Sequence, residues 1–123
     1  MAKRRDSVKR HRATRWAYHA TDSRRIPLVK EFGLLGAGDS DSLVALAREP
    51  KARGWRRVLW FTSHSTDPPE WYGDSLFRFP WPRRFVHGIE DGEYATDIPV
   101  PASKVEILMG GRWVALEGSD EVY

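Results

Sequence analysis

Hydrophobic residues in this chain gather in short runs that are separated by glycine, proline and charged residues. The run over residues 16–19 predicts a short buried strand, and the alternation over 75–79 predicts another, which ends at the prolines on either side of Trp81. The near-continuous apolar run within 57–62 predicts a strand that is buried on both faces. Runs of this length indicate a domain that is rich in strands.

Further strands are predicted in the second half of the chain. A short apolar run over residues 85–89 predicts one strand, and residues 93–98 predict a weaker one. Residues 105–109 and 112–116 flank a Gly-Gly pair, which is a strong turn signal and predicts a β-hairpin.

One helix is predicted directly after the first strand. Thr21 or Ser23 would cap its beginning, and Pro27 is tolerated only in its first turn. Gly33 suits the position just past its end. The residues that share its apolar face are Ile26, Val29 and Phe32.

A second, shorter helix would begin at Ser40 or Asp41, and Pro50 would end it. The sequence therefore predicts an α+β domain with small mixed or antiparallel sheets and one or two helices.

The composition is that of one folded domain. The chain has 123 residues, of which 41% are hydrophobic and 12% aromatic, and this is enough for a real core. It contains no cysteine, which excludes disulfides and thiolate metal sites. The apolar runs are too short for a transmembrane helix, and the N-terminus lacks the apolar stretch of a signal peptide. We therefore expect a cytoplasmic protein that does not contact a membrane.

The charge is distributed unevenly along the chain. Residues 1–15 contain seven Lys and Arg residues and one acid, whereas the remainder contains 13 basic and 16 acidic residues. This predicts a flexible basic arm over residues 1–14 and a single domain over 15–123. The arm either contacts a nucleic-acid backbone or is a solvated terminus.

Three short patches place polar residues at the ends of predicted strands, where small domains usually build a ligand cleft. The patches are Tyr18-His19-Ala20-Thr21, then Leu59-Trp60-Phe61-Thr62-Ser63, and then Glu93-Tyr94 followed by Ile98-Pro99.

Each patch has a chemical and a structural interpretation. His19 and Thr21 can hydrogen-bond to a ribose hydroxyl, and Thr62 and Ser63 offer hydroxyls at a cleft wall. Glu93 can stabilise positive charge that develops on a ribose carbon. Taken singly, the same residues are also explained as a buried histidine, an ordinary strand exit and a solvated turn residue.

The order and spacing of the patches resemble the ADP-ribosyltransferase family, in the branch with His rather than Arg in the first motif. In that family a helix with the pattern "I..I...GL" follows the first motif, and residues 25–34 are similar to it. The second motif ends a strand with an aromatic residue and Ser or Thr. The third places a Glu before an "(I/L)PP" strand, as around Glu93 and residues 98–101. The resemblance covers about residues 16–109.

The resemblance implies that NAD is the substrate and that the bond between nicotinamide and ribose is cleaved. An aromatic ring from Trp60, Phe61 or Tyr72 would stack on the nicotinamide. The residues implied to bind NAD are Tyr18, His19, Thr21, Trp60, Phe61, Thr62, Ser63 and Tyr72.

The catalytic residues implied by the resemblance are Glu93 and His19. Because the gap between Glu93 and the following proline is longer than usual in the family, Glu70, Glu90 and Asp91 are the alternative carboxylates. The acceptor of ADP-ribose would be a macromolecule, either protein or nucleic acid. A small protein of this kind would suit a bacterial or phage conflict factor, such as a toxin or an inhibitor.

Other functions remain open at the level of sequence. An RNA 2′-phosphotransferase-like enzyme on the same fold would need basic cleft residues, and the candidates are Arg24, Arg25, Arg56 and Arg57. A non-enzymatic module could bind nucleic acid or protein through the basic arm and surface aromatics such as Trp55, Trp71 and Trp81. No metal-ligand spacing is present, so no metal is expected.

Overall fold

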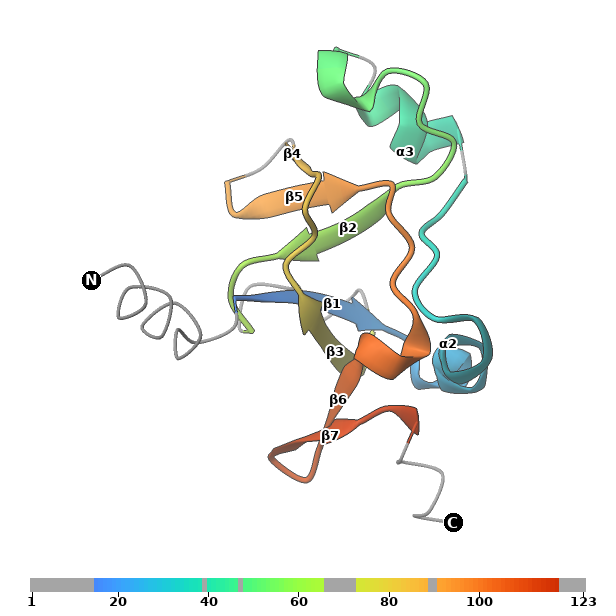
Figure 1. Ribbon diagram of the computed structural model, residues 1–123, viewed down its shortest axis with the longest axis vertical. Helices are drawn as coiled ribbons and strands as arrows, with labels where there is room; N and C mark the ends of the chain where they lie inside the picture. The colour runs from blue at the N-terminus through green and yellow to red at the C-terminus, as the bar shows by residue number, and fades with distance from the viewer. Residues whose placement is uncertain (1–14, 39, 47, 66–72, 89–90, 118–123) are drawn as a thin grey trace, which may run out of the picture.

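The computed structural model describes residues 15–38, 40–46, 48–65, 73–88 and 91–117. Its centre is a seven-stranded sheet with the strand order β4-β5-β2-β1-β3-β6-β7 (Figure 1). The strands are β1 (Trp16–Thr21), β2 (Leu59–Thr62), β3 (Ser75–Pro80), β4 (Val86–His87), β5 (Glu93–Thr96), β6 (Glu106–Met109) and β7 (Arg112–Ala115). All neighbouring strands are antiparallel. The α+β class is therefore confirmed, with one antiparallel sheet.

Each predicted strand has a counterpart in this sheet, although some are shorter than expected. β5 ends at Thr96, and two residues on the backbone N–H of Ile98 donates to the Thr96 hydroxyl at 3.1 Å instead of to a neighbouring strand. The predicted hairpin is β6–β7. Its two turn residues, Gly110 and Gly111, have φ of 58° and 78°, which glycine adopts without steric cost.

Short helical elements flank the sheet. They are η1 (Ser23–Arg25), α2 (Ile26–Phe32), α3 (Ser40–Ala45), η2 (Pro50–Ala52) and η4 (Ala102–Lys104). The predicted second helix corresponds to α3, which ends at Ala45, well before Pro50. Pro50 instead begins η2, where its fixed φ suits the first helical position.

The first helical segment is capped by Asp22, and the prediction of Thr21 or Ser23 was wrong. The Asp22 Oδ1 accepts a hydrogen bond from the Arg24 backbone N–H at 2.9 Å. A carboxylate accepts such bonds more strongly than a hydroxyl does. The Arg24 side chain also donates to Asp22, and these bonds lower the pKa of Asp22 to about 2. Pro27 lies in the first turn of α2, as expected.

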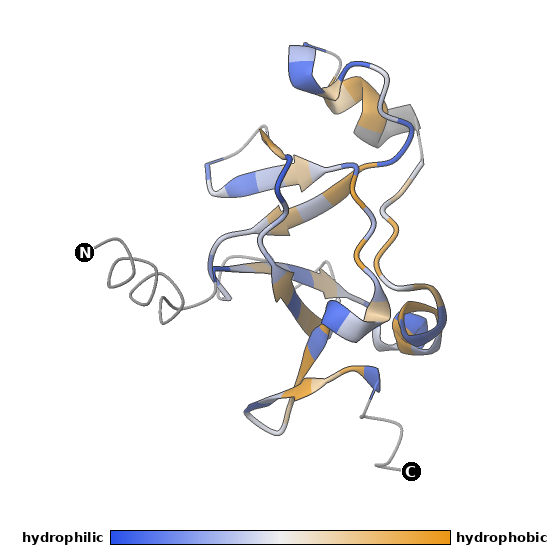
Figure 2. Ribbon diagram, viewed as in Figure 1, coloured by the Kyte–Doolittle hydropathy of each residue, from blue (hydrophilic) through white to orange (hydrophobic). Residues whose placement is uncertain are grey.

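The main hydrophobic core lies on one face of the sheet, against α2 and η4. Hydropathy and burial alternate along β2 (Figure 2), and in the central strands every second side chain faces this core. α2 contributes Val29 to it. The strand residues that form it are Ala17, Leu59, Phe61, Phe77, Phe79 and Ile107.

A second hydrophobic cluster lies on the opposite face, at the β4 end of the sheet. Ala95 is paired with Val86 and with Trp60, so these three residues share a face that Phe61 and Leu59 do not. Leu46, just past α3, and residues of the η2 turn pack on them. Figure 1 shows α3 at this end of the molecule and the β6–β7 hairpin at the other.

Farther along the same face, the sheet carries a layer of stacked polar and aromatic side chains, which we call the Arg78 layer (Trp16, Tyr18, Arg78, Glu106 and Trp113). The Arg78 Cζ lies 4.1 Å from the ring centroid of Trp16 and 4.5 Å from that of Trp113. Its guanidinium pairs with Glu106 at 2.6 Å. The Arg78 side chain keeps 20% of its surface exposed, so this layer faces solvent.

Candidate functional site: a cavity between α2 and the two central strands

A cavity of about 320 Å³ lies between α2 and the strands β1 and β2. These two strands pair at only one position, Tyr18 with Thr62. The cavity opens beside the part of β1 that β2 does not cover. Its volume is at the lower end of the range of ~300–1,000 Å³ that is typical of small-molecule pockets. The cavity can therefore enclose part of a ligand.

The wall of the cavity combines a few polar groups with a broad apolar rim. His19 and Thr21 of β1 contribute the polar side chains, together with Arg25 at the start of α2. Leu28 and Phe32, one turn apart on α2, form the rim with 56% and 55% of their surface exposed. Convergent polar groups within an apolar wall are typical of a site for an organic ligand.

His19 is the best-defined polar group of the cavity. Its Nδ1 lies 2.7 Å from the Trp60 carbonyl oxygen. A carbonyl only accepts, so Nδ1 carries the proton and donates it. Burial lowers the pKa of His19, although the Trp60 hydrogen bond opposes this shift, and the nearby Arg25 lowers the pKa further. The neutral ring therefore presents Nε2 as an acceptor, and no hydrogen bond to Nε2 forms within the described residues.

The rear wall of the cavity is a strip of backbone that follows α2. Leu34 exchanges two hydrogen bonds of 2.8 Å with Val100, and Ala37 exchanges two of 2.9 Å with Val58. The strip starts at Gly33, whose φ is 77° and where an added Cβ would lie 2.1 Å from the Val100 oxygen. Only glycine permits this approach, and it fixes how closely α2 lies over the sheet.

The three sequence patches lie on adjacent strands. Tyr18 of β1 is paired with Thr62 of β2, and Thr62 is paired with Glu93 of β5. Segments that are more than 30 residues apart in the sequence are thus brought side by side. The pleat divides them between faces, however, because His19 points to the opposite face from Tyr18, Thr62 and Glu93.

Some of the predicted site residues contact this cavity and others do not. His19, Thr21 and Trp60 line it. The Trp60 carbonyl holds the imidazole, while its indole packs against the second cluster. Tyr18 belongs to the Arg78 layer, where its ring centroid lies 5.8 Å from that of Trp113. Phe61 is 2% exposed and packs in the main core, so it has no free face for stacking on a ligand.

The hydroxyls of the second patch are used in the turn that follows β2. The Thr62 Oγ1 donates to the His64 carbonyl at 3.1 Å, and the Ser63 Oγ lies 2.9 Å from the His64 Nδ1. Both are ordinary strand-exit contacts. Neither residue lines the cavity.

Glu93 begins β5 and is half-buried. Its side chain lies over Gly88 on the β4 side, since a Cβ added at Gly88 would come within 2.4 Å of the Glu93 Oε1. Glu93 is therefore absent from the lining of the cavity. Among the alternative carboxylates, Asp91 is exposed in the turn before β5. Glu70 and Glu90, like Tyr72, lie outside the described residues.

Sequence reasoning missed the residues of the rim. Leu28 and Phe32 are spaced as neighbours on one helical face, beside the buried Val29, and this spacing was the available signal. Phe32 was instead expected on the core-facing side. Its 55% exposure shows that α2 turns this ring toward the cavity mouth.

The surface tryptophans expected of a binding module are packed in the structure. Trp81 lies in an aromatic cluster with Phe61, Phe85 and Tyr94, and its ring centroid is 5.0 Å from that of Phe61. Trp55 packs against the second cluster. Trp71 and the arm over residues 1–14 lie outside the described residues.

No group of three or more His, Asp or Glu side chains suited to a metal ion occurs in the described part of the chain. Within that part, no helix has the length and apolar character needed to cross a membrane. Comparison with protein-family models, with curated proteins and with solved structures finds no match. The functional argument therefore rests on the residues of the cavity and on the strands that place them.

Proposed function

We propose that this protein is an NAD-dependent ADP-ribosyltransferase-like enzyme that modifies a macromolecule. The observation that carries the proposal is the neutral His19, held by the Trp60 carbonyl at 2.7 Å at the edge of a cavity that Thr21 also lines. An imidazole Nε2 that accepts, beside a hydroxyl that both donates and accepts, matches the vicinal hydroxyls of a ribose.

The remaining cavity residues suit the rest of a dinucleotide. Arg25 supplies a permanent cation for the pyrophosphate, which an arginine can bind through two hydrogen bonds. Leu28 and Phe32 offer an apolar surface for an aromatic ring. The cavity holds only part of NAD, so the remainder would extend along this rim.

In the proposed reaction, the bond between the nicotinamide nitrogen and the ribose C1′ breaks, and nicotinamide leaves with the electron pair. Positive charge develops on the ribose and is stabilised by a carboxylate. A nucleophile of the acceptor then bonds to C1′ and loses its proton to a base. We assign the carboxylate to Glu93 because the family resemblance gives it this role. Its strand β5 lies beside β2, whose Trp60 carbonyl holds His19, but the Glu93 side chain points to the other face of the sheet, so it would have to reorient to reach the ribose.

A second candidate follows from the position of Glu93. Its side chain lies over Gly88, and none of the cavity-lining residues is acidic. Without a carboxylate at the ribose, the same cavity would bind the dinucleotide and leave it intact. NAD binding and NAD cleavage must therefore be measured separately.

The test is calorimetric titration with NAD, alongside nicotinamide release, on the wild type, His19→Ala and Glu93→Gln. We expect His19→Ala to lose binding and cleavage, and Glu93→Gln to keep binding and lose cleavage. Thr62→Val serves as a control, because the Thr62 hydroxyl is used by the His64 carbonyl outside the cavity. Binding without release by the wild type would favour the second candidate, and no binding at millimolar NAD by folded protein would reject both.

A further inference from the structure

A second hollow lies at the β4 edge of the sheet and shares no lining residue with the cavity at His19. It has a volume of about 800 Å³ and lies between the start of η2 and the segment that leads into β4. We call it the β4 groove. Its titratable lining residues are Lys51, Arg83, Arg84 and His87, with Glu49 as the one carboxylate.

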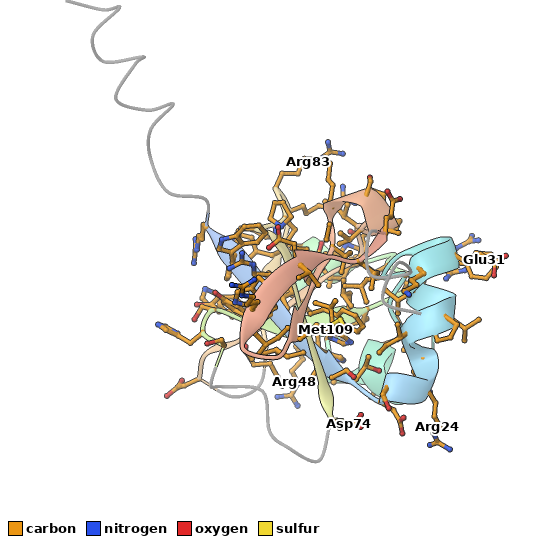
Figure 3. All side chains as sticks on the ribbon, turned by 90° about the horizontal axis from the view of Figure 1, so that it is seen from below. Arg24, Glu31, Arg48, Asp74, Arg83 and Met109 are labelled. Atoms are coloured by element: carbon orange, nitrogen blue, oxygen red, sulfur yellow. The ribbon has the colours of Figure 1, made fainter. Side chains whose placement is uncertain are left out.

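Two of the cations of the β4 groove are available to a ligand. Arg84 is paired with Asp97 at 2.7 Å, so its charge is compensated. Lys51 and Arg83 are exposed, and within the described residues neither is paired with an acid. Figure 3 shows the Arg83 side chain projecting from the body of the protein into solvent.

The wall that carries Arg83 is held in place by buried contacts. Thr96 is fully buried, and its hydroxyl donates to the Arg84 carbonyl oxygen at 2.6 Å. The Arg84 guanidinium is fixed in turn by Asp97 through Nε at 2.9 Å. Because Thr96 and Asp97 hold the backbone and the side chain of Arg84, this wall of the groove is formed before a ligand arrives, and this reduces the entropy lost on binding.

Basic charge continues beyond the groove along the turn after η2. Arg53, Arg56 and Arg57 are all exposed, and segment 51–57 contains no acid. Arginine binds phosphate oxygens through two parallel hydrogen bonds and is always charged. A ligand that carries several phosphates in a row would satisfy both the groove and this turn.

We propose that the β4 groove binds the backbone of single-stranded nucleic acid. Besides its cations, the groove is lined by the exposed His87 and by the half-buried Phe85, whose ring also packs against Trp81; the centroids of the two lining rings are 6.3 Å apart. Aromatic rings beside basic residues are typical of proteins that bind single strands, because the bases stack on the rings. A flexible strand can enter a hollow, whereas the phosphates of a duplex lie on a convex surface.

An extended peptide fits this edge less well. A peptide that adds to a sheet needs a long free edge for backbone hydrogen bonds, and β4 has only two residues. The nucleic-acid proposal stands without any NAD chemistry. That the bound strand is also the acceptor of ADP-ribose rests on the proposed function.

The experiment is a fluorescence-anisotropy titration of a labelled single-stranded 20-nucleotide oligomer with the full chain, without NAD, at several salt concentrations. The test variant is Lys51→Glu with Arg83→Glu. The matched control is Lys104→Glu with Arg112→Glu, which makes the same change in charge on η4 and β7, away from the β4 edge. The basic arm is present in every protein, so its contribution cancels.

We expect the test variant to lose at least about tenfold in affinity. The slope of the logarithm of the binding constant against the logarithm of the salt concentration should fall in magnitude by about 1.4, since each of two phosphate contacts on a single strand contributes roughly 0.7. The control should stay within about twofold of wild type. Equal losses in both variants, or tighter binding of a duplex or of an acidic peptide, would overturn the proposal.

Failure of the wild type to bind the oligomer would overturn it as well. If circular dichroism shows that the glutamate variant is unfolded, the variant Lys51→Gln with Arg83→Gln replaces it. Its control is then Lys104→Gln with Arg112→Gln. The two proposals fail separately, because binding of the oligomer is measured without NAD and nicotinamide release is measured without the oligomer.

Discussion

The two faces of β1 use neighbouring residues in opposite ways. Tyr18 points into the Arg78 layer, where the guanidinium is sandwiched between tryptophan rings and paired with Glu106 at 2.6 Å. His19 points to the other face, where one ring nitrogen is used by the Trp60 carbonyl and the ring lines a cavity. In the Arg78 layer Arg78 and Glu106 satisfy each other, whereas in the cavity one acceptor is left for a ligand.

This difference separates a structural arrangement from a binding site better than residue type does. Both faces carry aromatic and polar residues, and both have an arginine nearby. A stacked, ion-paired arginine has its partners within the fold, whereas a histidine with one ring nitrogen unused above a hollow is available for recognition. The two faces should therefore respond differently to mutation.

Phe61→Ala should have the largest effect, because Phe61 holds the core on the cavity side of the sheet. Its ring packs edge-on against Phe79 and Trp81 and is 2% exposed. Truncation of a buried phenylalanine costs about 3–5 kcal/mol. Urea unfolding followed by circular dichroism would measure it. A loss below about 1 kcal/mol would contradict the assignment of Phe61 to the core.

Arg78→Ala should cost less, at about 1–2 kcal/mol, because the Arg78 layer is partly open to solvent and water weakens its ion pair. Arg78→Lys should recover only part of this loss, since an ammonium group does not stack between Trp16 and Trp113 as a guanidinium does. The same urea series measures both variants. A full recovery by lysine would show that charge alone, and not stacking, stabilises this face.

His19 should make the stability depend on pH, since burial lowers its pKa in the folded protein. Below the ordinary histidine value of 6.5, the unfolded chain takes up a proton that the folded chain resists. The contribution is therefore present above about pH 6.5 and is lost as the pH falls toward the lowered value, with a slope of at most about 1.4 kcal/mol per pH unit.

His19→Gln removes this titration while the other histidines remain. The difference in unfolding free energy between wild type and variant should change between pH 7 and 5, with the wild type losing more. A difference that stays constant across this range would show that the ring is not shielded from water.

Phe32→Ser should have the smallest effect on stability, within about 0.5 kcal/mol, because the ring is 55% exposed at the cavity rim. It should nevertheless weaken NAD binding in calorimetric titration. Ile26→Ala on the same helix is the matched control, because Ile26 packs against the main core and does not line the cavity; it should do the reverse, lowering stability while leaving the rim intact. Equal effects of the two variants on binding would show that the rim does not contact the ligand.

Local pattern was enough to predict most of the secondary structure. The Gly-Gly pair fixed the β6–β7 hairpin, because both turn residues need positive φ, and Gly33 marked the end of α2 for the same reason. The apolar runs located the strands because alternation and burial leave a local signature. The cap at Asp22 was missed because several adjacent residues were chemically able to cap.

The candidate site was predictable only in part. The pattern identified His19 and Thr21 as cleft residues, and both line the cavity. It also named Tyr18 and Phe61, which the pleat and the packing direct elsewhere. The β4 groove had no single motif, since its walls come from segments 49–51 and 83–87, which are more than 30 residues apart.

The sequence by itself determined where strands, turns and helices form, because these depend on neighbours within a few residues. Only the tertiary structure decided which face of each strand is covered, which patches become adjacent, and where the hollows lie. The physical reason is that an alternation of period two gives each strand two distinct sides but not their orientation. That orientation is set by long-range packing, here by α2 on one face and the η2 turn on the other.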